Sequence, residues 1–119
     1  MLTVFNKMKA LASEILQGAE KGQQTRAMVL LSATGAEYCA VIKNVPSEYE
    51  TDEKKLLENL KGDTEITYLL CMWQNGCIDL PPFAFRKLLC ELNSKNLDCG
   101  IFVMTDSGYS IRKLSNSMK

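Results

Sequence analysis

Apolar residues recur at offsets of three and four positions along the start of the chain. They are Leu2, Phe5, Met8, Ala12, Ile15, Leu16 and Ala19. This spacing fits the 3.6-residue period of a helix, and Gly22 provides a stop signal. The pattern therefore predicts an N-terminal helix over about residues 2–21.

Two short apolar runs follow, over residues 27–32 and 37–43, and only a glycine-containing segment of four residues separates them. Runs this close predict two antiparallel strands joined by a hairpin turn. A polar stretch then predicts a second helix over about residues 51–61. Thr51, Asp52 and Glu53 have the composition of its amino-terminal cap region, and Gly62 is expected to end it.

The run Ile66–Trp73 is almost entirely apolar, which is typical of a central strand covered on both faces. A loop follows. Pro81 and Pro82 then lead a third helix, which is expected to end near Asn93, because the first turn of a helix tolerates proline.

The last part of the chain alternates like a strand pair. Residues 99–105 predict a buried strand, residues 106–108 a turn, and residues 109–114 an edge strand. The tail from residue 115 is expected to fray.

The predicted order is α-β-β-α-β-α-β-β in a single domain, residues 1–119. The helical crossover between strands 66–73 and 99–105 is long enough to make them parallel, whereas the last turn permits only an antiparallel return. The fold class is therefore α/β, with a three-layer-type, mixed five-stranded sheet and helices packed against it. Ligands usually bind beyond the carboxyl ends of parallel strands, which places a pocket near residues 73–77 and the turn after Pro81.

The amino-acid composition excludes several classes of function. Of 119 residues, 46% are hydrophobic and 24% charged, as in an ordinary globular domain. Fourteen basic and fourteen acidic residues give zero net charge, so we expect neither a nucleic-acid nor a membrane partner. The sequence has no histidine, which excludes a histidine general base, a catalytic triad and a zinc site with histidine ligands.

The five cysteines are Cys39, Cys71, Cys77, Cys90 and Cys99. Their odd number and wide spacing, without an evident secretory leader, favour reduced thiols and a cytoplasmic protein. Cys71 and Cys99 fall in apolar strands and are expected to be buried. Cys77 falls in the loop before the third helix and is a candidate nucleophile or redox group.

Two stretches of the chain are similar to a known family. The hairpin from Met28 to Val45 ends in an Asn-Val step, and residues 66–107 supply a strand, a proline-led helix and a further strand. Together they resemble the cytidine deaminase superfamily, which implies a cytidine deaminase-like fold. In that family, His-Ala-Glu or Cys-Ala-Glu opens one helix and Pro-Cys-x-x-Cys another. These motifs supply three zinc ligands and a glutamate that moves protons while zinc-bound water attacks the pyrimidine.

The departures from these motifs are specific. The first motif aligns on Thr51-Asp-Glu53, which keeps the glutamate, and the second on Pro81-Pro-Phe-Ala-Phe-Arg86. The three zinc-ligand positions are thus Thr51, Pro82 and Phe85. The substrate-binding Asn-x-Glu element keeps only Asn44. The resemblance therefore implies a degenerate member, without bound zinc and without deaminase chemistry, whose Phe85 ring fills the metal cavity.

Several functions stay open. The first is a catalytically inactive binding, regulatory or assembly module, which the resemblance implies forms a homo-oligomer, a dimer or a tetramer. The second is a protein that binds a nucleoside or nucleotide without turnover. Its candidate residues are Asn44, Glu53, Trp73, Phe83 and Arg86. The third is an enzyme with altered chemistry centred on Cys77, and the fourth is a partner-binding α/β domain without this ancestry.

The same residues also have purely structural interpretations. Glu53 would be a first-turn acid that complements the helix dipole, and Arg86 would pair with Asp79 or Glu53. The rings of Trp73 and Phe83 would simply pack against their neighbours.

Overall fold

The computed structural model describes residues 2–18, 25–43 and 46–118, and the side chains of residues 46–51 are not described. Ten elements follow one another along the chain. They are α1 (Leu2–Gln17), β1 (Arg26–Ser32), β2 (Glu37–Ile42), α2 (Pro46–Glu58), β3 (Ile66–Trp73), α3 (Phe83–Leu92), the 3₁₀ helix η1 (Ser94–Asp98), β4 (Gly100–Thr105), β5 (Gly108–Lys113) and α4 (Leu114–Ser117).

The five strands form one sheet in the order β2-β1-β3-β4-β5. The pair β3–β4 is parallel, and the other three neighbouring pairs are antiparallel. This confirms the mixed sheet, the hairpins at both ends and the crossover that the sequence predicts. The strand β3 is central and buried along most of its length, as its apolar run indicates.

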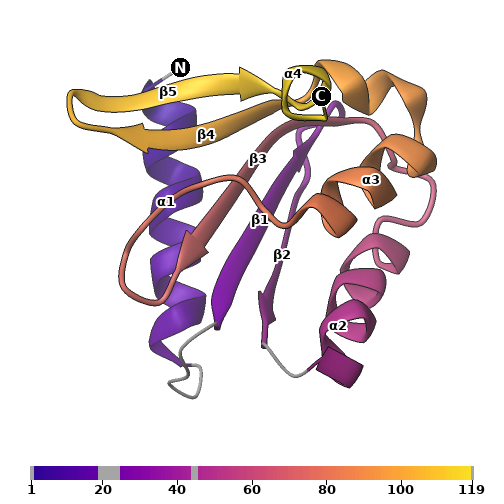
Figure 1. Cartoon of the computed structure of the whole chain (residues 1–119), viewed down its shortest axis with the longest axis horizontal. Helices are drawn as coiled ribbons and strands as arrows, with labels where there is room; N and C mark the ends of the chain where they lie inside the picture. Colours follow the sequence, from indigo (N-terminus) through magenta and orange to yellow (C-terminus); the bar gives the residue numbers. More distant parts are fainter. Residues whose placement is uncertain (1, 19–24, 44–45, 119) are drawn as a thin grey trace.

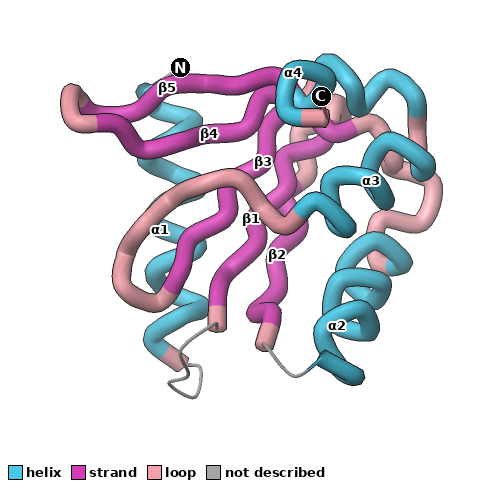
Figure 2. The backbone as a smooth tube through the Cα atoms, viewed as in Figure 1, coloured by secondary structure: helices cyan, strands magenta, loops and turns pink. Residues whose placement is uncertain are grey.

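Helices cover both faces of the sheet, which gives three layers (Figures 1 and 2). The helix α1 packs on one face, where Phe5 stacks on Tyr109 of β5 with ring centroids 4.2 Å apart. The helices α2 and α3 pack on the other face, where Leu56 and Leu89 join the core. In the described part of the chain, no helix has both the length and the apolar character needed to cross a bilayer.

A buried amide fixes the carboxyl end of α3 against the start of β3. Asn96 of η1 is fully buried, and its Oδ1 accepts the Ile66 backbone N–H at 2.7 Å. Its Nδ2 donates to the carbonyl oxygens of Leu89 and Thr64, each at 3.0 Å. Because its bonds go to α3, β3 and the segment before β3, Asn96 sets where the last turn of α3 lies relative to the sheet.

Three helix boundaries differ from the sequence prediction. The helix α2 ends at Glu58, before the predicted end near residue 61, so Gly62 does not end it. The helix α2 begins at Pro46, five residues before the predicted start at Thr51. Proline fits the first helical position because that residue's N–H would have no partner within the helix. Thr51 is therefore inside the helix and is not its cap. The helix α1 ends at Gln17, before the predicted end near residue 21.

The C-terminal segment also differs from its prediction. Instead of a frayed tail from residue 115, the chain continues into α4 (Leu114–Ser117), and Leu114 is fully buried. The Leu114 N–H donates to the Cys99 carbonyl at 2.9 Å, which joins this short helix to the start of β4.

Candidate functional site

The loop after β3, where the sequence predicts a pocket, folds back as a tight turn. The Trp73 N–H donates to the Cys77 carbonyl at 2.8 Å, and the Gly76 N–H donates to the Trp73 carbonyl at 2.9 Å. Gly76 has a φ of 89°, which glycine adopts without steric cost. Met72 then bridges to Ile78. Backbone pairing therefore closes this loop upon itself.

A buried ion pair lies on the side of the sheet that α2 and α3 cover. Nη2 of Arg26, the first residue of β1, donates to Oε1 of Glu53 in α2 at 2.9 Å. Both side chains are only 1% exposed. Glu53 was predicted to be a first-turn acid, and this is wrong, because α2 begins seven residues earlier at Pro46. Its carboxylate is held by a guanidinium from the sheet.

The ring of Trp73 contacts the same guanidinium. Arg26 and Trp73 are cross-strand partners in the register of β1 and β3, and Cζ of Arg26 lies 4.9 Å from the Trp73 ring centroid. A guanidinium at this distance from an indole face makes a cation–π contact. The ring that was a candidate for stacking on a base thus contacts an internal cation.

The positions that the resemblance assigns to zinc do not fit that ion. Phe85 is 0% exposed and belongs to the core between the sheet, α2 and α3, and its side chain has no ligating atom. Pro82 caps α3, and its carbonyl accepts the N–H groups of Phe85 and Arg86. Thr51 lies in α2, and its side chain is outside the description. Among the described residues, no three His, Cys, Asp or Glu side chains are grouped to hold a metal ion.

The other candidate residues do not converge on one ligand site. Arg86 does not pair with Asp79 or Glu53; its Nε donates to the Pro81 carbonyl at 3.0 Å and its Nη1 to the Ser117 carbonyl. Phe83 is 53% exposed and lies 5.5 Å from the Arg86 guanidinium. Asn44 lies outside the described residues.

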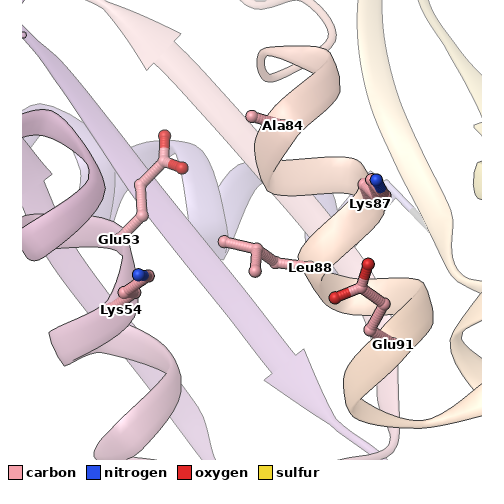
Figure 3. A pocket seen from close by; sticks show the side chains of 6 residues that line it. All are labelled: Glu53, Lys54, Ala84, Lys87, Leu88 and Glu91. Atoms are coloured by element: carbon pink, nitrogen blue, oxygen red, sulfur yellow. The ribbon is translucent and has the colours of Figure 1, made fainter.

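An open cavity of about 250 Å³ lies between α2 and α3 (Figure 3). Its lining residues are Glu53, Lys54, Ala84, Lys87, Leu88 and Glu91. Of the predicted substrate-binding residues that the structure describes, only Glu53 lines it. Ala84 belongs to the first turn of α3, so Glu53 shares this cavity with the helix that begins after Pro82.

Three cysteines have the exposure that the sequence predicts. Cys71 and Cys99 are buried, and burial raises the pKa of each thiol to about 12. Cys77 is exposed at the surface of the tight turn, where its backbone N–H donates to Oδ1 of Asn75 at 2.9 Å.

Arg26 is the main site residue that the sequence prediction missed. Its position contains a signal, because alternation along β1 places it on the same face as Met28 and Leu30, both fully buried. A charged residue at an inward strand position requires a buried partner of opposite charge.

Comparisons with known proteins identify the fold. No family model and no curated protein sequence matches this chain. Among solved structures, cytidine deaminase from Mycobacterium leprae matches with a TM-score of 0.69 at 16% identity, over 96% of both chains. Cytidine deaminase from Mycobacterium tuberculosis matches with a TM-score of 0.67 at 17% identity, over 95% of this chain and 92% of that one. Cytidine deaminase from Burkholderia pseudomallei matches with a TM-score of 0.68 at 12% identity, over 93% of both chains. The chain therefore has the cytidine deaminase-like fold, as the resemblance implies.

Proposed function

We propose that this chain is a non-deaminating module of the cytidine deaminase-like fold, which acts by binding, regulation or assembly. The observation that carries the proposal is the burial of Phe85, which is 0% exposed and which the resemblance aligns with a zinc-binding cysteine of the family. With Pro82 at the second such position, the start of α3 offers no side-chain ligand. Zinc is what makes water nucleophilic at neutral pH in such sites, so deamination has no nucleophile here.

The environment of Glu53 supports the same proposal. In the family, the glutamate of this motif carries protons between water and the pyrimidine. Here Glu53 is buried and bonded to Arg26 at 2.9 Å. The Glu53 carboxylate is therefore engaged by a partner within the protein. Glu53 thus serves the stability of the fold instead of catalysis.

Assembly as a homo-oligomer, a dimer or a tetramer, is part of this proposal. It is supported by Met104 and Ile111, which are 43% and 41% exposed. In the β4–β5 register, Met104 pairs with Tyr109 and Phe102 with Ile111, so Met104 and Ile111 are diagonal neighbours on one face of the hairpin. The five free cysteines support a cytoplasmic setting for this assembly.

A second candidate function is nucleoside or nucleotide binding without turnover. The open cavity of about 250 Å³ that Glu53 lines favours it, because apolar and charged side chains line this cavity together. Trp73 and Phe83 do not contribute to this cavity, so a bound base would have to lie against Leu88 and Ala84 instead.

Thermal unfolding with cytidine, uridine and their monophosphates, each with and without zinc, tests the proposal. A ligand at a hundredfold excess over its dissociation constant stabilises a protein by about 2.7 kcal/mol, which shifts Tm by several degrees. We expect no shift that needs zinc, together with a dimer or tetramer in sedimentation. A shift with nucleoside alone would favour the second candidate. A shift that needs cytidine and zinc together would contradict the proposal, and a monomer at every concentration would contradict its assembly part.

A further inference from the structure

We infer that Arg26 is an internal cation that takes over the electrostatic role of the metal ion in this fold. The inference rests on the proposed function, because it assumes that no zinc ion stands beside Glu53. The inference explains why the buried Glu53 carboxylate is stable. It also implies that the site does not bind added divalent cations.

The register of the sheet places Arg26 where such a cation is needed. Arg26 lies opposite Trp73, and alternation along β1 puts it on the same face as Met28 and Leu30. Both of these residues belong to the core beneath α2 and α3. The Arg26 side chain therefore enters the layer between sheet and helices, and there it meets Glu53 of α2 at 2.9 Å.

The position of this pair is next to the altered motif of α3. Glu53 and Ala84 line the same cavity (Figure 3). In the sequence, Ala84 lies between Pro82 and Phe85. The guanidinium thus pairs with the glutamate that the resemblance aligns with one motif, and this glutamate shares a cavity with the helix that carries the other, altered motif.

A guanidinium suits this task in two ways. It is covalently part of the chain, so its charge cannot dissociate from the core as a metal ion can. It is also planar and packs on aromatic faces, and the Trp73 ring centroid lies 4.9 Å from Cζ. A divalent cation brought to Glu53 would lie next to this fixed positive charge and be repelled by it.

A double-mutant cycle with Arg26→Met and Glu53→Met tests the inference, with thermal unfolding as the readout. Either single change leaves a buried charge without its main counterion, so we expect each to lower Tm by more than about 10 °C. The double variant should recover at least half of the summed loss, because no charge then remains. The matched controls are Arg112→Met and Glu58→Met, which change exposed residues and should shift Tm by less than about 3 °C.

Arg26→Lys is a second variant, for the case in which Arg26→Met does not fold. It keeps the positive charge and loses the planar contact with Trp73, so we expect a folded protein with a smaller loss of Tm than Arg26→Met. Additive losses in the cycle, or a lysine variant as unstable as the methionine variant, would overturn the inference. Cytidine turnover by the unmodified chain would overturn the proposed function instead, and it leaves the outcome of the cycle unaffected.

Discussion

Arg86, near the start of α3, donates a hydrogen bond from Nη1 to the carbonyl oxygen of Ser117 in α4, 31 positions further along the chain. Its Nε donates to the Pro81 carbonyl at 3.0 Å, and the guanidinium lies 5.5 Å from the Phe83 ring centroid. These contacts are all internal. Arg86 thus fastens the C-terminal helix to α3.

Replacing Arg86 by methionine should release α4. Loss of these charge-assisted bonds is expected to lower the free energy of unfolding by about 1–2 kcal/mol and to speed amide exchange over residues 114–118. Hydrogen exchange followed by mass spectrometry measures this locally. Lys87→Met, at the exposed neighbouring position, is the control. Unchanged exchange in α4 would show that Arg86 does not hold it.

Gly100, the first residue of β4, lies in close contact with two side chains. A Cβ atom there would stand 2.8 Å from Cγ2 of Ile111 and 3.0 Å from Cδ1 of Tyr68. We expect Gly100→Ala to lower the free energy of unfolding by about 1–3 kcal/mol, because both neighbours must move. Denaturant unfolding measures the change.

Two further variants make this prediction specific. Ile111→Ala in the Gly100→Ala background should restore part of the loss, since it removes the nearer atom. Gly62→Ala should be almost neutral, because nothing lies within 4 Å of a Cβ atom at that position. Equal effects at Gly100 and Gly62 would contradict the close packing between β4 and its neighbours.

The Asp63 carboxylate should make stability depend on acid pH. Hydrogen bonds from Ser32, Tyr38 and Thr34 hold the pKa of Asp63 below its ordinary value of 3.8. A lowered folded-state pKa adds stability above the unfolded value, and this stability is lost as pH falls through 3.8 toward the folded value. The substitution Asp63→Asn removes the carboxyl group that titrates.

Unfolding of both proteins should therefore be followed as a function of pH. We expect the advantage of the native chain over Asp63→Asn to be constant above about pH 5 and to shrink below it. The change is small, because this carboxylate is at the surface. Parallel curves down to about pH 2 would show that the hydroxyl groups do not stabilise its charge.

Thiol alkylation at neutral pH should separate the cysteines by exposure. Cys39 and Cys77 are exposed and should react in the native protein, whereas Cys71 and Cys99, whose pKa burial raises to about 12, should react only after denaturation. Mass spectrometry of the partly modified native protein gives the order. Cys77→Ser should leave oligomeric state and ligand binding unchanged. Loss of a measurable activity in that variant would instead favour an enzyme centred on Cys77.

The sequence predicts the strands of the sheet well, because a buried strand corresponds to a continuous run of apolar residues. The prediction for β3 coincides with the observed Ile66–Trp73, and its parallel partner β4 begins one residue after its predicted start. The amino end of α2 was placed too late, because residues 46–50 have no apolar periodicity and proline is usually taken to end a helix. The resemblance correctly indicates the fold, although the identities to the solved structures that share it are only 12–17%.

The centre of the site could not be predicted in the same way. Arg26 and Glu53 lie 27 positions apart, and no local pattern links a strand's first residue to a residue two turns into a helix. Their pairing depends on the sheet register and on how α2 lies over the sheet. Similarly, Asn96 sits in a polar stretch that indicates a surface loop, yet it is fully buried between α3 and β3. Such contacts arise from tertiary packing.

Cytidine deamination by the purified chain with added zinc tests the central claim most directly. An active cytidine deaminase assayed in parallel is the positive control, and the zinc content of the dialysed chain is measured in the same samples. We predict no uridine above the protein-free blank and far less than one zinc ion per chain. Zinc-dependent formation of uridine that Glu53→Gln abolishes would contradict the account, because it would show that Glu53 still carries protons in a working site.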